Sequence, residues 1–271
     1  MKLKSKVLII AGSDSSGGAG IQADIKTTTA LGSYAMTAIT AVTCQNTKGV
    51  KVITSILPKI IQKQITMVLD DIGADAIKIG MLHNAKVIKC VHKVLKKNKS
   101  KNIILDPVMI AKGGARLVNK NSIKYLKKLL IPLCNVITPN IPEAEVLTGH
   151  SISNKEDMIK AAKKIINMGA KNVLLKGGHL KNKMIFDILV SKNEVKIFPK
   201  RKIRTRNTHG TGCTLSSALA TCLSQKMNIY KSCKTSLRYV DQAIYTAPGY
   251  GKGHGPLNHL VSFNLKNINA K

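Results

Sequence analysis

The sequence predicts an α/β protein with a mainly parallel central sheet and helices on both faces. Short apolar, β-branched runs alternate with longer amphipathic stretches along most of the 271 residues. That alternation is the pattern of successive βαβ units, which build parallel sheets. No repeat, low-complexity linker or change in composition divides the chain, so we expect a single domain over residues 1–271.

The expected strands are short runs bounded by Gly, Pro or polar residues. Residues 6–11 are apolar and end in a glycine-rich turn over residues 12–20, as a buried strand does. Residues 34–44 are β-branched and apolar, which predicts one bent strand or a pair of strands. The further expected strands are residues 76–81, 102–109, 135–138 and 171–176, and a hairpin of 184–190 with 194–198 at a sheet edge.

The expected helices lie between and after these strands. Residues 21–31 predict a helix that Gly32 ends, and Pro58 begins another with its aliphatic residues on one face. The further expected helices are residues 85–97, 122–130, 154–168, 211–224 and 231–246.

The composition has one unusual feature, a formal net charge of +31 from 44 Lys and Arg against 13 Asp and Glu. A basic chain can bind nucleic acid. The lysines are spread along the whole chain, however, and only 3% of the residues are aromatic, so no base-stacking surface is predicted. We interpret the charge as a solvated surface that can attract anionic substrates, and we expect no specific nucleic-acid partner. A basic nucleic-acid-binding protein is the alternative from a different class.

The six cysteines are scattered without a Cys-x-x-Cys pair, which argues against a disulfide framework and a zinc site. A reducing compartment is therefore expected. The apolar run at residues 7–11 is too short for a signal peptide, and no segment has the length of a membrane span. We expect a cytoplasmic protein with no membrane partner.

A glycine-containing loop before the expected helix at 211–224 is the candidate centre of a site. Gly210, Thr211 and Gly212 precede a run of small apolar residues. The first turn of a helix has free N–H groups and the positive end of its dipole, so such a loop suits a phosphate or a developing anion. Cys213 lies in the same turn, where this field favours its thiolate. An anion cradle beside a proton acceptor predicts phosphoryl transfer to a hydroxyl; the alternative is a tight turn beside a buried cysteine.

Further candidate residues lie at the carboxyl ends of the expected strands, where ligands bind in such sheets. Asp106 can hold Mg²⁺ or cap a turn. Asn140 and Glu143 have the spacing of a capping box, and Glu143 can also face a metal. Lys176 puts a cation on a rigid strand. The full set is Gly12, Asp14, Gln45, Met81, Asp106, Asn140, Lys176 and Gly177.

The glycine-rich turn at residues 12–20 has neither the Gly-x-Gly-x-x-Gly pattern nor the Gly-Lys-[Ser/Thr] of a Walker loop. We interpret it, with residues 112–114, as a hinge or lid. Asp24 either hydrogen-bonds a polar ligand or is a charge at a helix start. His209 precedes the anion loop, but no Ser/His/Asp spacing supports hydrolysis.

Six stretches together resemble one family, the hydroxymethylpyrimidine/phosphomethylpyrimidine kinases of thiamine biosynthesis, within the ribokinase-like superfamily. They are Ala-Gly-Ser-Asp-Ser-Ser-Gly-Gly-Ala-Gly-Ile-Gln-Ala-Asp (11–24), Ala-Ile-Thr-Ala-Val-Thr-Cys-Gln-Asn-Thr (38–47), Asp-Pro-Val-Met (106–109), Thr-Pro-Asn-Ile-Pro-Glu-Ala-Glu (138–145), Leu-Lys-Gly-Gly-His (175–179) and Asn-Thr-His-Gly-Thr-Gly-Cys-Thr-Leu-Ser (207–216). The resemblance implies a three-layer α/β/α ribokinase-like fold. It also implies two ATP-dependent phosphorylations, first of the hydroxymethyl group of 4-amino-5-hydroxymethyl-2-methylpyrimidine and then of the monophosphate to the diphosphate.

The resemblance also implies roles for the candidate residues. Asp24 and Gln45 would hydrogen-bond the pyrimidine beside Gly12, with Met81 and Val108 packing on its ring. Gly210, Thr211 and Gly212 would form the anion hole, and Cys213 would take the hydroxyl proton. Asn140, Lys176 and Gly212 would bind ATP, Lys176 would neutralise phosphate charge during transfer, and Asp106 and Glu143 would hold Mg²⁺.

Much of the superfamily has Asp where this chain has Cys213, and a thiol with a pKa of about 8.5 needs the helix terminus to act at neutral pH. The second phosphorylation attacks with an ionised phosphate oxygen and needs no base. The nearest alternative is a pyridoxal or pyridoxine kinase on the same scaffold, but the segment Ile-Ala-Lys-Gly-Gly-Ala after Met109 is similar to the pyrimidine kinases. A homodimer is common in the family and is expected here.

Overall fold

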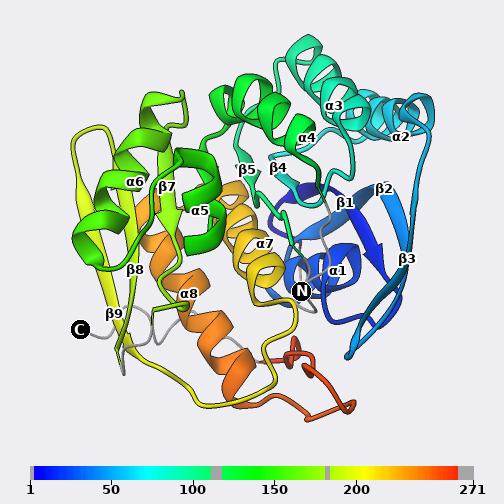
Figure 1. Cartoon of the computed structure of the whole chain (residues 1–271). Helices are drawn as coiled ribbons and strands as arrows, with labels where there is room; N and C mark the ends of the chain where they lie inside the picture. The colour runs from blue at the N-terminus through cyan, green and yellow to red at the C-terminus, as the bar shows by residue number, and fades with distance from the viewer. Residues whose placement is uncertain (1–2, 111–117, 181–183, 262–271) are drawn as a thin grey trace.

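A nine-stranded sheet organises the residues that the computed structural model describes, 3–110, 118–180 and 184–261. The strands lie in the order β3-β2-β1-β4-β5-β6-β7-β8-β9, from right to left in Figure 1. The neighbours from β2 to β7 are parallel, while β3, β8 and β9 pair antiparallel at the two edges. The mainly parallel sheet is therefore confirmed. The strands are β1 (Lys6–Asp14), β2 (Tyr34–Asn46), β3 (Gly49–Ser55), β4 (Ala76–Ile79), β5 (Ile103–Leu105), β6 (Val136–Ile137), β7 (Asn172–Leu175), β8 (Met184–Ser191) and β9 (Val195–Arg201).

The expected helices appear in the predicted order, and those expected at residues 85–97 and 211–224 have the predicted bounds. The further helix at Ile141–Thr148 was indicated only by the capping-box spacing of Asn140 and Glu143. The helix expected at 122–130 begins earlier, after the N-cap Asn119, and passes into a π-helical turn at Leu126–Leu130. The helices are α1 (Gly20–Ala30), α2 (Pro58–Asp71), α3 (Ala85–Lys97), α4 (Lys120–Tyr125), α5 (Ile141–Thr148), α6 (Lys155–Asn167), α7 (Thr211–Ser224) and α8 (Ile229–Tyr245). None of the helices in the described ranges is long and apolar enough to cross a membrane.

Two strand predictions differ from the structure. β3 was not predicted, because this edge strand is half-buried or exposed along its length and has no apolar alternation. The strand expected at residues 102–109 ends at Leu105, because Pro107 follows and the Val108 N–H donates to the Asp106 carbonyl at 2.8 Å, which turns the chain. Residues 106–109 are thereby free to line a site rather than to extend the sheet.

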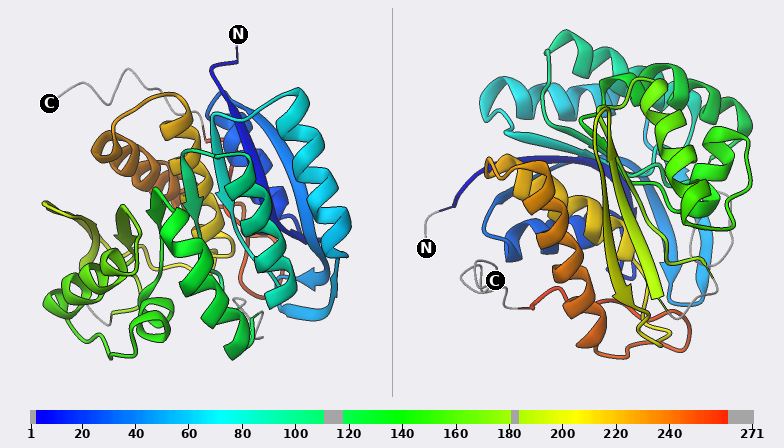
Figure 2. Two further views of the ribbon diagram at one scale, coloured as in Figure 1. Left: turned by 90° about the horizontal axis from the view of Figure 1, so that it is seen from above. Right: turned by 90° about the vertical axis from the view of Figure 1, so that its left-hand side faces the viewer.

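The sheet separates two apolar layers, and alternate residues of each strand point to opposite layers. Leu8, Ile79 and Leu105 pack with α2, α3, α5 and α6 on one face. Ile9 and Ile104 pack with α1, α7 and α8 on the other face. Figure 2 shows these two groups of helices on opposite sides of the strands. This is the predicted three-layer α/β/α arrangement.

The chain order of the strands reverses beside β1. From β1 the chain passes to β2 on one side, and β4 then pairs with the other side of β1. In open parallel sheets such a reversal opens a crevice at the carboxyl ends of the strands, where ligands bind. The polar residues predicted at strand ends therefore lie where the topology itself favours a site.

Candidate active site

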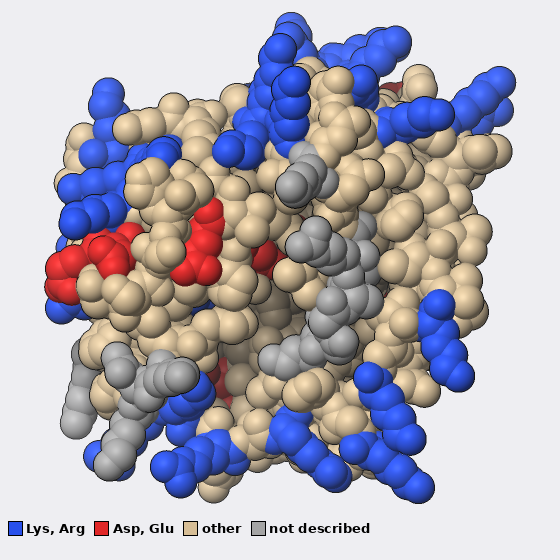
Figure 3. Space-filling view, viewed as in Figure 1, with Lys and Arg blue, Asp and Glu red and all other residues tan. Residues whose placement is uncertain are grey.

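A cavity of about 850 Å³ opens at the carboxyl ends of the parallel strands. Figure 3 shows the hollow with acidic side chains inside it and Lys and Arg on the surrounding surface. Every predicted site residue except Asp24 and Gly177 lines it, although they come from seven separate stretches of the chain. Those residues are Gly12, Gln45, Met81, Asp106, Val108, Asn140, Glu143, Lys176, Gly210, Thr211, Gly212 and Cys213.

The anion loop enters α7 at Gly210. This residue has φ of 83°, a left-handed conformation that favours glycine, and a Cβ there would overlap the carbonyl oxygen of Gly18. Its carbonyl accepts the first helical hydrogen bond, from the Thr214 N–H at 2.8 Å. The Thr211 N–H donates to the Thr208 carbonyl at 3.4 Å, whereas helix geometry gives the N–H groups of Gly212 and Cys213 no acceptor within the helix. Thr211 holds the turn through its hydroxyl, which donates to the Thr208 carbonyl at 3.2 Å.

Gly212 brings this loop close to the charged end of the cavity. A Cβ at Gly212 would lie 3.3 Å from Lys176 Nζ and 3.4 Å from Asp106 Oδ2. Lys176 Nζ is 3.2 Å from Asp106 Oδ1, which also accepts from the Thr138 hydroxyl at 3.3 Å. A bare backbone, a cation and a carboxylate therefore converge, an arrangement that can hold and neutralise a phosphate group.

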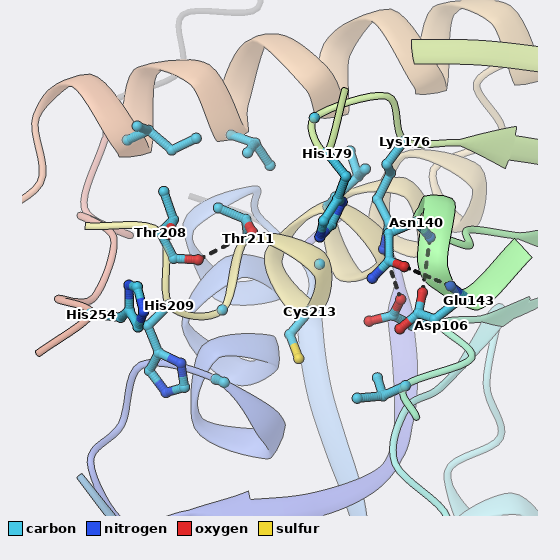
Figure 4. Close-up of a pocket in the computed structure, with 18 of the residues that line it drawn as sticks. Asp106, Asn140, Glu143, Lys176, His179, Thr208, His209, Thr211, Cys213 and His254 are labelled. Carbon is cyan, nitrogen blue, oxygen red and sulfur yellow. Dashed lines mark hydrogen bonds and ion pairs between the residues drawn. The ribbon is translucent and has the colours of Figure 1, made fainter. Parts of the chain in front are cut away.

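Glu143 completes this charged cluster from the start of α5. The predicted capping box is confirmed: Asn140 accepts from the Glu143 N–H at 2.9 Å, and Glu143 Oε2 accepts from the Asn140 N–H at 2.9 Å. Burial raises the pKa of Glu143 to about 7; Lys176 opposes this shift and Asp106 adds to it. Burial by itself lowers the pKa of Lys176, but Asp106 and Glu143 together raise it above its ordinary value. Figure 4 shows the four side chains gathered on one side of the cavity.

The same cluster fits a Mg²⁺ ion that is shared with a substrate. Among the residues that the structure describes, no group of three His, Cys, Asp or Glu side chains could hold a metal ion alone. Mg²⁺ is usually bound by one or two carboxylates with waters and substrate phosphates. Asp106 and Glu143 supply two carboxylates at this end of the cavity, beside the Lys176 ammonium.

The opposite side of the cavity suits a flat apolar ring. Met81 and Val108 pack in one small apolar cluster, and a Cβ at Gly12 would overlap the Met81 methyl group. Gln45 adds an amide whose Oε1 accepts from the Thr43 hydroxyl at 3.2 Å. An apolar wall with one fixed amide can select a heteroaromatic ring by shape and by its polar edge.

His209 and Asp14 form a close side-chain contact that was not predicted from the sequence. His209 Nε2 lies 2.8 Å from Asp14 Oδ2 and 3.2 Å from Gln45 Nε2. Asp14 also accepts from the backbone N–H groups of Ser16 and Ala19, at 2.9 and 2.8 Å. Burial alone raises the pKa of Asp14, but the hydrogen bonds from His209 and Ser16 hold it at about 2. The contact joins the glycine-rich turn to the anion loop. The position of His209 directly before Gly210 is the sequence feature that could have indicated it.

The expectation that the helix terminus favours a Cys213 thiolate is wrong in this structure. Cys213 is partly exposed to the cavity, but the protein around its sulfur raises the pKa of the thiol to about 12. Lys78 lowers this pKa, while Asp24 and Asp106 raise it. Desolvation of the thiolate therefore outweighs the helix field.

The prediction that Asp24 hydrogen-bonds the pyrimidine is also wrong. Asp24 is 0% exposed, its Oδ2 lies 2.6 Å from Lys78 Nζ, and its Oδ1 accepts from the Ser217 hydroxyl at 2.7 Å. Because α1 begins at Gly20, position 24 lies one turn into the helix and faces α7 and the sheet. The missed signal was Lys78 within an apolar strand, since a buried lysine needs a buried partner.

The predicted lid at residues 112–114 lies outside the described residues. The other predicted lid, at Gly17 and Gly18, lies against the anion loop, since a Cβ at Gly18 would be 3.2 Å from Pro256 Cβ and 3.3 Å from His209 Nε2.

Comparisons with known proteins agree with this geometry. The family model described as phosphomethylpyrimidine kinase matches residues 14–258. The thiamine biosynthesis bifunctional protein ThiED of Geobacter sulfurreducens is 46% identical over 96% of this chain, which spans only 53% of that protein. The hydroxymethylpyrimidine/phosphomethylpyrimidine kinase of Bacillus subtilis is 44% identical, with 98% of both chains covered.

The comparison with solved structures agrees with the family match. The crystal structure of a phosphomethylpyrimidine kinase from Clostridium difficile has a TM-score of 0.80 and 46% identity, covering 89% of this chain and 100% of that one. The pyridoxal kinase from Staphylococcus aureus in complex with pyridoxal has a TM-score of 0.89 at 32% identity, covering 98% of this chain and 96% of that one. The chain therefore has the ribokinase-like fold that the sequence predicted.

Proposed function

The chain belongs to the phosphomethylpyrimidine kinase family, and we propose that it phosphorylates 4-amino-5-hydroxymethyl-2-methylpyrimidine and then its monophosphate, with ATP as co-substrate. The observation that carries this function is the convergence of two sites in one cavity. The anion loop with Cys213, the apolar ring site and the cluster of Lys176, Asp106 and Glu143 all line this cavity. Transfer of a phosphoryl group to a hydroxyl on a ring requires these parts close together.

The ring site positions the acceptor. Met81 and Val108 would pack against the pyrimidine, and Gln45 would hydrogen-bond its polar edge. The hydroxymethyl group would then lie near Cys213, whose sulfur would take the hydroxyl proton as the new O–P bond forms. The same step breaks the bond between the γ-phosphorus and the bridging oxygen, and ADP leaves.

The charged end binds and neutralises the phosphates. The backbone N–H groups of Gly210, Thr211 and Gly212 would stabilise charge on the transferred group, because they are fixed before the reaction starts. Lys176 would balance the same charge from the other side, and Asn140 would contribute to ATP binding. Asp106 and Glu143 would hold Mg²⁺, which when bound shields the charge of the β- and γ-phosphates.

The second phosphorylation uses the same cavity with a different nucleophile. A phosphate oxygen of the monophosphate is already ionised at neutral pH and needs no proton acceptor. Cys213 should therefore matter for the first step and hardly for the second. This asymmetry makes the proposed function testable with a single substitution.

The test is product analysis with ATP, Mg²⁺ and the hydroxymethylpyrimidine, comparing wild type, Cys213→Ala and Cys222→Ala. Cys222 is the matched control, since it is a buried cysteine of the same helix that does not line the cavity. We expect wild type and the control to form monophosphate and diphosphate. Cys213→Ala should slow the first phosphorylation by about 100-fold and leave the rate of the second nearly unchanged.

Pyridoxal is the competing acceptor, because the S. aureus pyridoxal kinase covers almost the whole chain. A wild-type protein that phosphorylates pyridoxal and leaves the hydroxymethylpyrimidine untouched would refute the proposed substrate. A homodimer, a single domain and a cytoplasmic location stay predictions, and sedimentation of the purified protein would test the first.

A further inference from the structure

The ion pair of Lys78 and Asp24 is joined through the Ser217 hydroxyl to α7, the helix that carries Cys213, and the mechanism above gives it no role. Lys78 is on β4 and Asp24 on α1, and both side chains are 0% exposed. Lysine is almost never fully buried unless it is paired. Because replacing a buried ion pair by apolar residues is often neutral or stabilising, stability alone is a weak reason for its presence here.

The surroundings hold the Lys78 ammonium in one place. Its Nζ lies 2.6 Å from Asp24 Oδ2, and the other carboxylate oxygen accepts from the Ser217 hydroxyl at 2.7 Å. A Cβ at Gly80 would be 2.9 Å from this Nζ, so glycine leaves the space that the ammonium fills. Ser217 lies one helical turn after Cys213 on α7, and residues four apart share a helix face.

Lys78 and Cys213 line the same cavity. The charged groups that act on Cys213 or lie on the elements around it are Lys78 on β4, Asp24 on α1, Asp106 after β5 and Lys176 after β7. Lys78 has the largest effect of the charges on this thiol and lowers its pKa, against the effect of burial. Asp24 in turn keeps Lys78 protonated, since it raises the pKa of the ammonium despite its burial.

We propose that Lys78, held by Asp24 and Ser217, is a positioning residue that keeps Cys213 able to accept the hydroxyl proton in the first phosphorylation. The inference rests on the proposed function. The reactive form is the Cys213 thiolate, a minor form at neutral pH because burial raises the pKa of the thiol. It takes the proton from the substrate hydroxyl while the oxygen bonds to the γ-phosphorus and ADP departs. The neutral thiol then returns its proton to water. The fixed ammonium raises the share of thiolate through its charge, and the second phosphorylation does not need it.

The test replaces the ion pair by an apolar pair, Asp24→Leu/Lys78→Met, because removing one partner alone would leave a buried unpaired charge. The two phosphorylations are measured separately, starting from the hydroxymethylpyrimidine and from its monophosphate. We expect the first to fall by about 100-fold in kcat with little change in KM. The second should stay close to the wild-type rate. Thr221→Val is the control, since it removes an uncharged buried hydroxyl one turn further along α7.

A double-mutant cycle separates this role from a structural one. In a Cys213→Ala background, Asp24→Leu/Lys78→Met should cause no further loss of the first step, because the group on which Lys78 acts is absent. The Asp24→Asn/Lys78→Met pair keeps the acceptor for Ser217 and serves if the apolar pair does not fold. Three outcomes would refute the role of Lys78 and leave the proposed function standing. They are equal loss of both phosphorylations, loss of neither, and an additive loss of the first step in the Cys213→Ala background. Wild type that phosphorylates neither acceptor would overturn the proposed function, and the role of Lys78 with it.

Discussion

Asp14→Asn is the substitution whose effect the structure predicts in most detail. Asp14 is 3% exposed and joins the glycine-rich turn to the anion loop through His209. Its pKa lies at about 2, below the ordinary value of 3.8. A shift of this size corresponds to about 2 kcal/mol of folding free energy at neutral pH. We expect Asn at this position to lower the free energy of unfolding by about that amount at pH 7, because an amide keeps the shape and loses the charge.

The contribution of Asp14 to stability depends on pH. A carboxylate with a lowered pKa in the folded state stabilises the protein above its unfolded pKa and loses this effect as the pH falls through the folded value. The difference in the free energy of unfolding between wild type and Asp14→Asn should therefore be constant above about pH 5 and should shrink between about pH 4 and pH 2. Urea unfolding at a series of pH values, followed by circular dichroism, measures it.

Asp157→Asn is the matched control. Asp157 also accepts two hydrogen bonds from one serine, Ser153, but it is only partly buried, at the start of α6. It should change the free energy of unfolding little, since surface interactions of this kind are weak. If Asp14→Asn and Asp157→Asn have similar effects at pH 7, or if the Asp14 effect does not diminish in acid, the Asp14 carboxylate does not stabilise the fold as argued.

Other predictions follow from the cavity. Lys176→Met should slow both phosphorylations by about 100-fold, because the lost cation faces the transferred group in each; an effect on one step only would contradict this, and steady-state kinetics decides. Met81→Ala should raise KM for the pyrimidine with kcat little changed, since packing on the ring is the same in the ground and transition states. Gly210→Ala should lower the midpoint of thermal unfolding, because φ is 83° and the Cβ meets Gly18; an unchanged midpoint would show that the turn relaxes. Chelation of divalent cations with EDTA should abolish both steps, and added Mg²⁺ should restore them.

The fold could be predicted from the sequence because strands and helices alternate regularly and turn residues mark their ends. The site could be placed because parallel strands end at one edge, which brings Gly12, Asp106 and Lys176 together from distant parts of the chain. The edge strand β3 was missed because it buries no continuous apolar face. Hydrophobic periodicity in the sequence predicts a strand or helix only where one face of that element is buried.

The errors concern side chains whose environment depends on packing. Position 24 is near the ligand along the chain, but the helix turns its carboxylate toward Lys78 and Ser217. The thiol of Cys213 lies at a helix start, yet desolvation by groups from other elements dominates its pKa. Neither the direction of a side chain in the third dimension nor its desolvation is encoded in a short motif.

One cavity can serve both acceptors because its phosphate-binding groups do not depend on the nucleophile. The N–H groups of the anion loop and the Lys176 ammonium are polar or charged whichever oxygen attacks, and both Gly212 and Lys176 lie beside the Asp106 carboxylate. The hydroxyl differs from the phosphate only in the proton it must lose. The groups that deal with that proton, Cys213 and the buried pair of Lys78 and Asp24, are different side chains from those of the Lys176 cluster. It follows that the first phosphorylation can be impaired without the second, whereas damage to the Lys176 cluster must impair both.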